Sequence, residues 1–240
     1  MYKKKSKNTK DGGFLEFFKT IFYAVFIAII FRSLLFEPYN IPSGSMLPNL
    51  LIGDYLFVSK FSYGYSRYSF PFGIVPLPES RILSAKPKRG DVAVFKLPSN
   101  TSINYIKRVI GLPGDSIQMK KGKLFINRNL ITQQEDGSYK HIYKRRFEQD
   151  FDKYKELLEN GKFYSVLNIN DFQALDNTQE FIVPKNKYFV MGDNRDNSND
   201  STKDVGFVPR ENFFGRADYL WMSWECWGCL PSFEKAGKIN

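Results

Sequence analysis

The hydrophobic residues of this chain follow one pattern near its start and another over the remainder. Near the start, a long apolar run covers Phe14–Phe36, with an uninterrupted core at Thr20–Phe31. Its charged residues, Glu16, Lys19 and Arg32, stand near the two ends, where long side chains can reach a membrane surface. This pattern predicts one transmembrane helix over residues 14–36. A buried core helix would look similar, whereas a cleaved signal peptide is disfavoured because "RSLLFEPYNIP" is not a small-residue cleavage site.

The remainder of the chain alternates between short apolar runs and turn residues. Runs rich in Val, Ile, Phe and Tyr are bounded by Gly, Pro, Asp and Asn, as in "GDYLFVSKFSYG" and "GDVAVFKLP". This composition is typical of strands and turns, and it predicts a mostly β fold with a hairpin in "KKGKLFINRNLI". The charged stretch 145–163 is the exception. We predict one helix there, ending at Gly161, inside a polar insertion of about residues 127–180.

Charge separates the two ends of the predicted helix. The formal net charge of the 240 residues is +10, and "MYKKKSKNTK" at the start holds five lysines and no acid. Such a segment fits nucleic acid, an anionic membrane surface or the cytoplasmic flank of a membrane helix. The apolar run favours the third, so the N-terminus is expected in the cytoplasm and everything after about residue 37 across the membrane. This placement, together with the lack of a nucleic-acid-binding motif, argues against a nucleic-acid partner.

Two cysteines, Cys226 and Cys229, form a lone C-x-x-C in "WECWGCLP". No thioredoxin-like βαβ pattern surrounds them, and no second pair completes a zinc site. A local disulfide and two free thiols both stay open, and we favour a structural role.

Two serines one glycine apart, Ser43 and Ser45, stand between prolines in "NIPSGSMLPNL" and are candidate nucleophiles. The usual base is a histidine, but the single histidine, His141, has no acidic or serine-rich neighbours and is expected at the surface. A lysine can serve instead if burial lowers its pKa. Lys107 in "YIKR" is the candidate, because the guanidinium of its neighbour Arg108 does not lose its proton. Taken alone, that motif favours an ordinary solvated strand lysine.

Acidic residues concentrate in one polar segment, "MGDNRDNSNDSTKDVGFVP". It combines four aspartates with Arg195 and Ser198; the aspartates are Asp193, Asp196, Asp200 and Asp204. A calcium loop is disfavoured because the glycine at its sixth position and the glutamate at its twelfth are missing. The composition favours an Asp–Arg network that braces a neighbouring site, with a plain polar turn as the alternative.

Five segments in this order resemble the successive motifs of bacterial type I signal peptidases: "IPSGSMLPNL", "GDYLFVSKFSYG", "KRGDVAVFKLP", "NYIKRVIGLPGD" and "GDNRDNSNDS…GFVP". The resemblance covers most of the chain outside about residues 127–180. It implies a serine endopeptidase with Ser45 as nucleophile and Lys107 as general base. It further implies that Ser43 and the backbone N–H of Ser45 form the oxyanion hole, and that Ser198 orients Lys107. The implied supporting network is Asp193, Arg195 and Asp200.

The same resemblance implies an architecture: one transmembrane helix and a strand-rich catalytic domain with an inserted smaller α+β subdomain. The expected divisions are a basic cytoplasmic segment 1–13, the helix 14–36, the catalytic halves 37–118 and 182–240, and the insertion 119–181. The expected location is the bacterial cytoplasmic membrane, with a cytoplasmic N-terminus and the catalytic domain on the other side. The protein is expected to act as a monomer.

The substrates implied by the resemblance are preproteins with signal peptides, cut after small residues through an acyl-enzyme, with no metal and no cofactor. The implied pocket positions, which would equally suit a plain core, are Tyr39, Ile41, Met46, Leu50, Tyr105 and Ile106. The loop 63–90 either dips into the lipid or lies at the protein surface. Its aromatic residues are Tyr65, Tyr68, Phe70 and Phe72.

Two positions depart from the family pattern. Thr202 replaces an arginine that often follows the bracing aspartate, so Asp200 is expected to pair with Arg195 or Lys203. Asn104 stands where an aspartate is frequent. Two other functions stay open. A Ser–Lys enzyme of the self-cleaving repressor type is disfavoured by the membrane helix, and a non-catalytic membrane protein that binds exported chains is disfavoured by the complete set of catalytic residue types.

Overall fold

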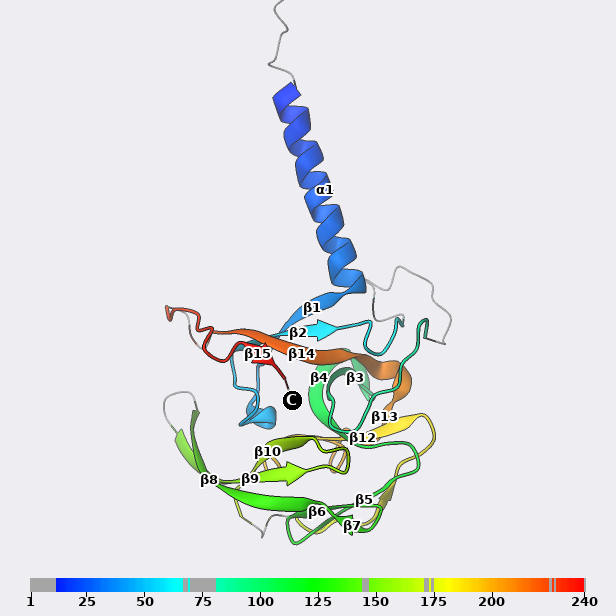
Figure 1. Cartoon of the computed structure of the whole chain (residues 1–240), viewed down its shortest axis with the longest axis vertical. Helices are drawn as coiled ribbons and strands as arrows, with labels where there is room; N and C mark the ends of the chain where they lie inside the picture. Colours follow the sequence, from blue (N-terminus) through cyan, green and yellow to red (C-terminus); the bar gives the residue numbers. More distant parts are fainter. Residues whose placement is uncertain are drawn as a thin grey trace, which may run out of the picture.

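The computed structural model describes residues 12–66, 69, 81–143, 147–170, 173, 175–224, 226 and 228–239. One long helix, α1 (Gly12–Leu34), rises from a body made of strands (Figure 1). The predicted mostly β fold behind a single apolar helix is confirmed. The lysine-rich segment 1–11 and the loop aromatics Tyr68, Phe70 and Phe72 lie outside the described residues.

Helix α1 exposes apolar side chains around its whole circumference. Every residue from Gly13 to Arg32 is exposed. The 22 residues Gly13–Leu34 form a helix apolar enough to cross a membrane, and at 1.5 Å per residue they are about 33 Å long, close to the thickness of a bilayer core. The helix itself ends at Leu34, and Phe36, the last residue of the predicted span, belongs to a strand.

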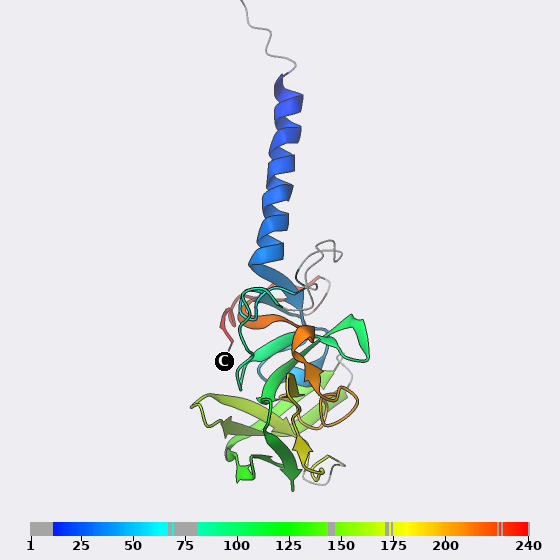
Figure 2. The ribbon, with the colours of Figure 1, turned by 90° about the vertical axis from the view of Figure 1, so that its right-hand side faces the viewer.

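Three antiparallel sheets make up the body. The largest has the strand order β1-β2-β14-β3-β4-β12-β13, with β15 paired to β14, and the smaller ones have the orders β10-β9-β8 and β11-β5-β6-β7. Figures 1 and 2 place the large sheet next to α1 and the small sheets at the far end of the body. The strands are β1 (Phe36–Asn40), β2 (Asp54–Ser59), β3 (Val92–Leu97), β4 (Asn100–Gly111), β5 (Ser116–Lys120), β6 (Lys123–Ile126), β7 (Asn129–Leu130), β8 (Thr132–Tyr143), β9 (Phe147–Leu157), β10 (Phe163–Asn168), β11 (Phe181–Ile182), β12 (Lys187–Met191), β13 (Val208–Pro209), β14 (Phe213–Ser223) and β15 (Gly237–Lys238).

The expected hairpin in "KKGKLFINRNLI" is confirmed by the pairing of β5 with β6. Lys121 and Gly122 form its turn, and both have positive φ, 48° and 70°. Two consecutive turn residues with positive φ give a two-residue turn a backbone twist that matches the twist of the strands it joins.

The helix predicted over 145–163 is wrong. The described part of that stretch contains β9, which is the central strand of its sheet and pairs with both β8 and β10. Its charged residues include Glu156, which is buried, while the adjacent Leu157 is 46% exposed, an alternation typical of a strand. Gly161 has a φ of +78° in the turn before β10, so it marks a turn between strands and not the end of a helix.

The segment 119–181 shares a hydrophobic core with the large sheet. One cluster joins Ile126 of β6 and Val166 of β10 to Ile110 of β4 and Phe189 of β12, and all four are fully buried. The described residues of this segment contain strands and turns and no helix, so its predicted α+β character is wrong. Strand pairing outweighs the helical preference of its charged residues.

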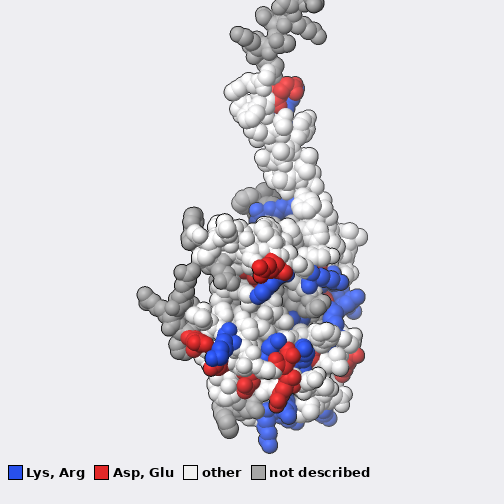
Figure 3. All heavy atoms as spheres, turned by 60° about the vertical axis from the view of Figure 1, so that its left-hand side comes forward, with Lys and Arg blue, Asp and Glu red and all other residues white. Residues whose placement is uncertain are grey.

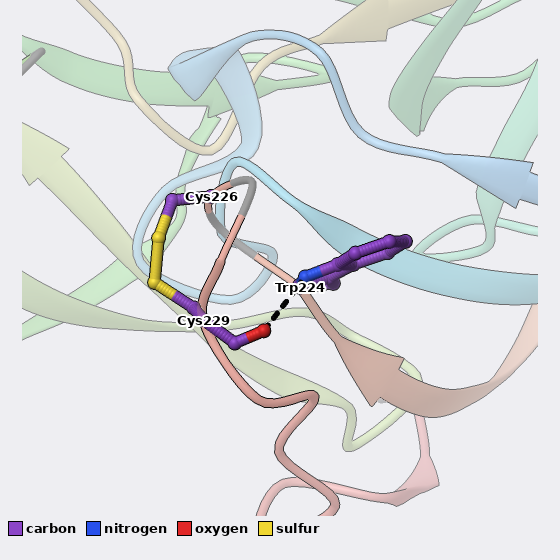
Figure 4. Close-up of a disulfide and its surroundings, with 3 residues drawn as sticks. All are labelled: Trp224, Cys226 and Cys229. Carbon is purple, nitrogen blue, oxygen red and sulfur yellow. Dashed lines mark hydrogen bonds between the residues drawn. A yellow bond between two sulfur atoms is a disulfide. The ribbon is translucent and has the colours of Figure 1, made fainter.

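The two cysteines, whose state the sequence leaves open, form a disulfide (Figure 4). The Cα atoms of Cys226 and Cys229 are 5.4 Å apart. Trp224 Nε1 donates a hydrogen bond to Cys229 O over 3.1 Å, so the short loop after β14 is closed by both a covalent and a polar contact.

Candidate active site

Ser45 lies in a short 3-10 turn, η1 (Gly44–Met46), four residues after β1. Only 8% of Ser45 is exposed. The loop after β12 can approach it closely because residue 192 is a glycine. A Cβ at Gly192 would lie 2.6 Å from Ser45 O, so any larger residue there would push the serine turn away.

Lys107 of β4 points at this serine. Its Nζ donates a hydrogen bond to Ser45 Oγ over 2.6 Å and another to Ile106 O over 3.0 Å. Only 3% of Lys107 is exposed. Burial lowers its pKa from 10.5 to about 8, and the negative charges of Asp200 and Asp193 oppose that shift. The structure therefore brings together a hydroxyl and an amine of reduced basicity, which is the arrangement needed to activate a serine without histidine.

Arg108 follows Lys107 and points to the opposite face of β4. Near its C-terminal end, the strand is buried on both faces. Its guanidinium holds Asp193 by two hydrogen bonds of 2.8 Å, Nε to Oδ1 and Nη2 to Oδ2. Asn49 Nδ2 donates to Asp193 Oδ2 over 2.7 Å. Asp193 is thus a fully buried carboxylate with its charge paired, and it ties β4 to the serine segment and to the 192–200 loop. The expected Asp–Arg bracing exists, but its arginine is Arg108.

Arg195 has a different partner from the one expected. Its Nη1 and Nη2 donate to the two carboxylate oxygens of Glu156 on β9, over 2.6 and 2.5 Å. Tyr164 OH donates to Glu156 Oε2 over 2.7 Å. Both ions are nearly inaccessible, with side chains 8% and 1% exposed. Sequence reasoning missed Glu156 because it lies inside the stretch mistaken for a helix.

Asp200 pairs with neither Arg195 nor Lys203, so that expectation is wrong. Gly192 N donates to its Oδ2 over 2.9 Å, while Thr202 N and Oγ1 donate to Oδ1 over 3.0 and 2.7 Å. Thr202 therefore supplies two uncharged donors to this carboxylate. The carboxylate of Asp200 is 1% exposed, and its charge acts on Lys107 from this fixed position.

Ser198 is buried beside Gly192. Its Oγ has no hydrogen-bond partner among the described residues. The expected bond to Lys107 is thus not formed here, and the orienting role of Ser198 stays a prediction.

Asn194 is a residue that sequence reasoning missed. Its backbone N–H donates to Ser45 O and its Nδ2 donates to Gly44 O, each over 3.1 Å. Asn194 is completely buried. It therefore holds both carbonyls of the Gly44–Ser45 segment in place. The available signal was its position between Asp193 and Arg195.

A cavity of about 420 Å³ opens over the two candidate catalytic side chains. It is lined by the serine turn, by β4 and by the polar loop: Pro42, Ser43, Gly44, Ser45, Ile103, Asn104, Tyr105, Ile106, Lys107, Asn197 and Asn199. Ser43 is exposed towards it and precedes η1 in an extended conformation. His141 does not line it; the ring of His141 stacks on Tyr139 on β8.

The six expected pocket residues divide into two groups. Tyr105 and Ile106 line the cavity. Tyr39 lies beside it, since its hydroxyl accepts a hydrogen bond from Asn104 Nδ2 over 3.1 Å. The remaining three are at most 2% exposed and belong to the hydrophobic core: Ile41, Met46 and Leu50.

Within the described ranges, no group of three or more His, Cys, Asp and Glu side chains is arranged to hold a metal ion.

The family model and two curated relatives show which family this chain belongs to. Residues 14–224 match the family model described as signal peptidase, peptidase S26. A signal peptidase I from Rickettsia canadensis is 42% identical over 212 residues, which are 85% of this chain and 78% of the relative. One from Rickettsia typhi is 41% identical over 219 residues, 86% and 79% of the two chains. A crystal structure of a signal peptidase I from Enterococcus faecalis is 28% identical and covers 55% of this chain and 97% of its own, with a TM-score of 0.33.

Proposed function

The chain belongs to the signal peptidase family, peptidase S26, and on this premise we propose that Ser45 is its nucleophile and Lys107 its general base. It is a serine endopeptidase, and its substrates are preproteins that carry signal peptides. The observation that carries the assignment of roles is the 2.6 Å distance between Ser45 Oγ and Lys107 Nζ in a buried site.

In the acylation step, neutral Lys107 accepts the proton of Ser45 Oγ while that oxygen attacks the carbonyl carbon of the scissile bond. The tetrahedral intermediate collapses when the Lys107 ammonium gives the proton to the leaving amine. The mature protein leaves, and the signal peptide stays attached to Ser45 as an ester. Deacylation repeats the sequence with water, which Lys107 deprotonates for attack on the ester carbonyl.

The oxyanion of each intermediate would lie against the backbone N–H of Ser45 and the hydroxyl of Ser43. The exposure of Ser43 towards the cavity supports this role. Removing one such donor commonly lowers kcat by a factor of about 100 to 1,000. Ser198 would orient Lys107 once its hydroxyl turns towards the amine. This role is supported by the buried Ser198 hydroxyl, which has no hydrogen-bond partner among the described residues and is therefore free to bond to Lys107.

The supporting network consists of three carboxylates with separate tasks. Asp193, held by Arg108, fixes the register of the catalytic segments, and Asp200 tunes the pKa of Lys107. The Arg195–Glu156 pair anchors the 192–200 loop to the sheet with the order β10-β9-β8. The pocket for small substrate residues would be formed by Tyr39, Tyr105 and Ile106. The core residues Ile41, Met46 and Leu50 would support it from beneath.

We place the N-terminus in the cytoplasm and the catalytic body on the opposite side of the bacterial cytoplasmic membrane. The exposed apolar helix α1 supports membrane anchoring (Figure 3). The lysine-rich start of the chain supports this orientation. The functional divisions would be the anchor, the catalytic halves 37–118 and 182–240 and the insertion 119–181, acting together as a monomer.

Cleavage of a purified preprotein with an A-x-A site tests the assignment. The products are read by intact mass, with Ser45→Ala and Lys107→Ala as inactive variants and Lys203→Ala, an exposed lysine of the neighbouring loop, as the matched control. We expect cleavage after the A-x-A site by the parent and the control alone. Activity that survives Lys107→Ala would place the base elsewhere. A folded but inactive parent would favour a protein that binds exported chains without cutting them.

A further inference from the structure

Helix α1 joins the catalytic body with almost no linker. The helix ends at Leu34 and β1 begins at Phe36, so a single residue separates them. The body contacts this junction directly, because Lys60 N donates to Leu35 O over 3.0 Å and Tyr65 OH donates to Leu34 O over 2.6 Å. The backbone at the end of the helix is therefore fastened to the segment that follows β2.

A cluster of three charged residues spans the same junction. Glu37 of β1 accepts from Arg32 in the last turn of α1 over 2.8 Å and from Lys60 after β2 over 2.7 Å. Each carboxylate oxygen thus has its own cation, one from the helix and one from the body. Their side chains are 61% exposed for Arg32, 15% for Glu37 and 2% for Lys60.

Lys60 is a buried ion that the proposed catalytic steps do not use. Besides Glu37, its Nζ donates to Ser69 O over 2.7 Å and lies 4.6 Å from the centre of the Phe214 ring. Burial lowers the pKa of Lys60, while Glu37 opposes that shift. Burying an ammonium is unfavourable unless it is paired, and here the carboxylate of Glu37 supplies the opposite charge.

The junction also sets how far the nucleophile lies from the membrane. Ser45 is ten residues beyond Leu35, and a chain of that length spans at most about 36 Å when fully extended. Much of the segment is β1, which is held in register against β2. A fixed angle between α1 and β1 therefore fixes the height of Ser45 above the bilayer surface.

We propose that Arg32, Glu37 and Lys60 form a positioning device that holds the catalytic body at a defined orientation on its membrane helix. This orientation would select the bond that is cleaved: Ser45 reaches only the peptide bond that lies at one distance from the apolar segment of a membrane-embedded substrate. The inference rests on the proposed function, because it assumes that α1 spans the bilayer and that Ser45 is the nucleophile. Arg32, Glu37 and Lys60 act through the orientation of the body and do not touch the substrate.

The test compares two kinds of substrate. The first is a series of preproteins in vesicles of phosphatidylethanolamine and phosphatidylglycerol, in which a Gly-Ser spacer of increasing length separates the apolar segment from the A-x-A site. The second is a soluble peptide with the same site. The main variant is Arg32→Gln, which removes one charge from the junction without leaving an unpaired buried ion. The matched control is Arg128→Gln, which breaks the exposed Arg128–Glu180 pair on the far side of the body.

We expect the parent and Arg128→Gln to cleave one spacer length fastest. Arg32→Gln should flatten this dependence and lower the peak rate by up to about fivefold, the upper end of the range for a partly exposed ion pair. Its kcat/KM for the soluble peptide should equal that of the parent. Glu37→Gln should have a larger effect on the same series, with folding checked by thermal unfolding.

Unchanged spacer dependence in both Arg32→Gln and folded Glu37→Gln would overturn the proposal, and so would an equal loss on the soluble peptide. A parent that cleaves neither substrate would instead refute the proposed function.

Discussion

The acid limb of the pH–rate profile tests the chemistry of Lys107 most directly. Burial lowers its pKa from 10.5 to about 8, which corresponds to about 3 kcal/mol at about 1.4 kcal/mol per factor of ten in proton affinity. The neutral fraction of the amine is then about 1% at pH 6, about 9% at pH 7 and about half at pH 8. An ordinary lysine would be about 0.03% neutral at pH 7. Because only the neutral amine can accept the Ser45 proton, kcat/KM should rise about 90-fold from pH 6 to pH 9 and then level off.

The assay measures kcat/KM on an N-acetylated peptide without His or Cys, so that the substrate itself does not titrate in this range. Ser45→Ala supplies the blank. His141→Gln is the control on the enzyme, because His141 is the single histidine of the chain and both cysteines are disulfide-bonded. Its profile should match that of the parent. A midpoint near 10.5 would mean that burial does not lower the pKa of Lys107, and a midpoint near 6.5 that disappears in His141→Gln would identify a histidine base. Either outcome would refute the reasoning.

Three further predictions concern the same site. Lys107→Met should raise the melting temperature at pH 7 by a few degrees, measured by scanning calorimetry. The reason is that burying the Lys107 amine, whose pKa is depressed, costs stability; this cost is fully present below about pH 8 and is relieved as pH rises towards 10.5. A lower melting temperature for the variant would contradict this. Asn194→Ala frees the carbonyl of Gly44 and should lower kcat for a soluble peptide at least tenfold at unchanged KM, whereas a change in KM alone would argue against a role in orienting the serine turn. Glu156→Gln leaves Arg195 as a buried cation without its carboxylate and should lower the free energy of unfolding by about 3 kcal/mol, measured with denaturant. An unchanged free energy of unfolding would mean that the pair is well hydrated and not buried.

The fold was predictable wherever the local pattern and the tertiary pairing agree. The apolar run of α1 and the turn at Lys121 and Gly122 are examples, because one is set by hydropathy and the other by local backbone geometry. The stretch containing β9 was not predictable from its own residues. Its charges suit a helix, and only its two neighbouring strands and the partner of Glu156 make it a strand.

The candidate site divides in the same way. Ser45 and Lys107 were identifiable through the five ordered segments that resemble a known family, since the motif around Lys107 alone favours a solvated strand lysine. The structure places Lys107 Nζ 2.6 Å from Ser45 Oγ. The partner of Arg195 was not identifiable, since any of several nearby acids would satisfy the composition and the chosen one, Glu156, comes from another sheet. The contacts of Asn194 escaped for a related reason: they bind backbone carbonyls, which carry no sequence signal.

The pairing of β1 with β2 has a consequence for the enzyme's own chain. Its N-terminal region, an apolar helix followed by an extended segment, has the same outline as a signal peptide and the region behind it. In the folded protein Phe36–Asn40 is hydrogen-bonded along its length to Tyr55–Ser59. A segment already held in this ladder is not available to bind in the cavity as a free strand. We therefore expect the junction between α1 and the body to resist cleavage by the enzyme itself while β1 stays paired.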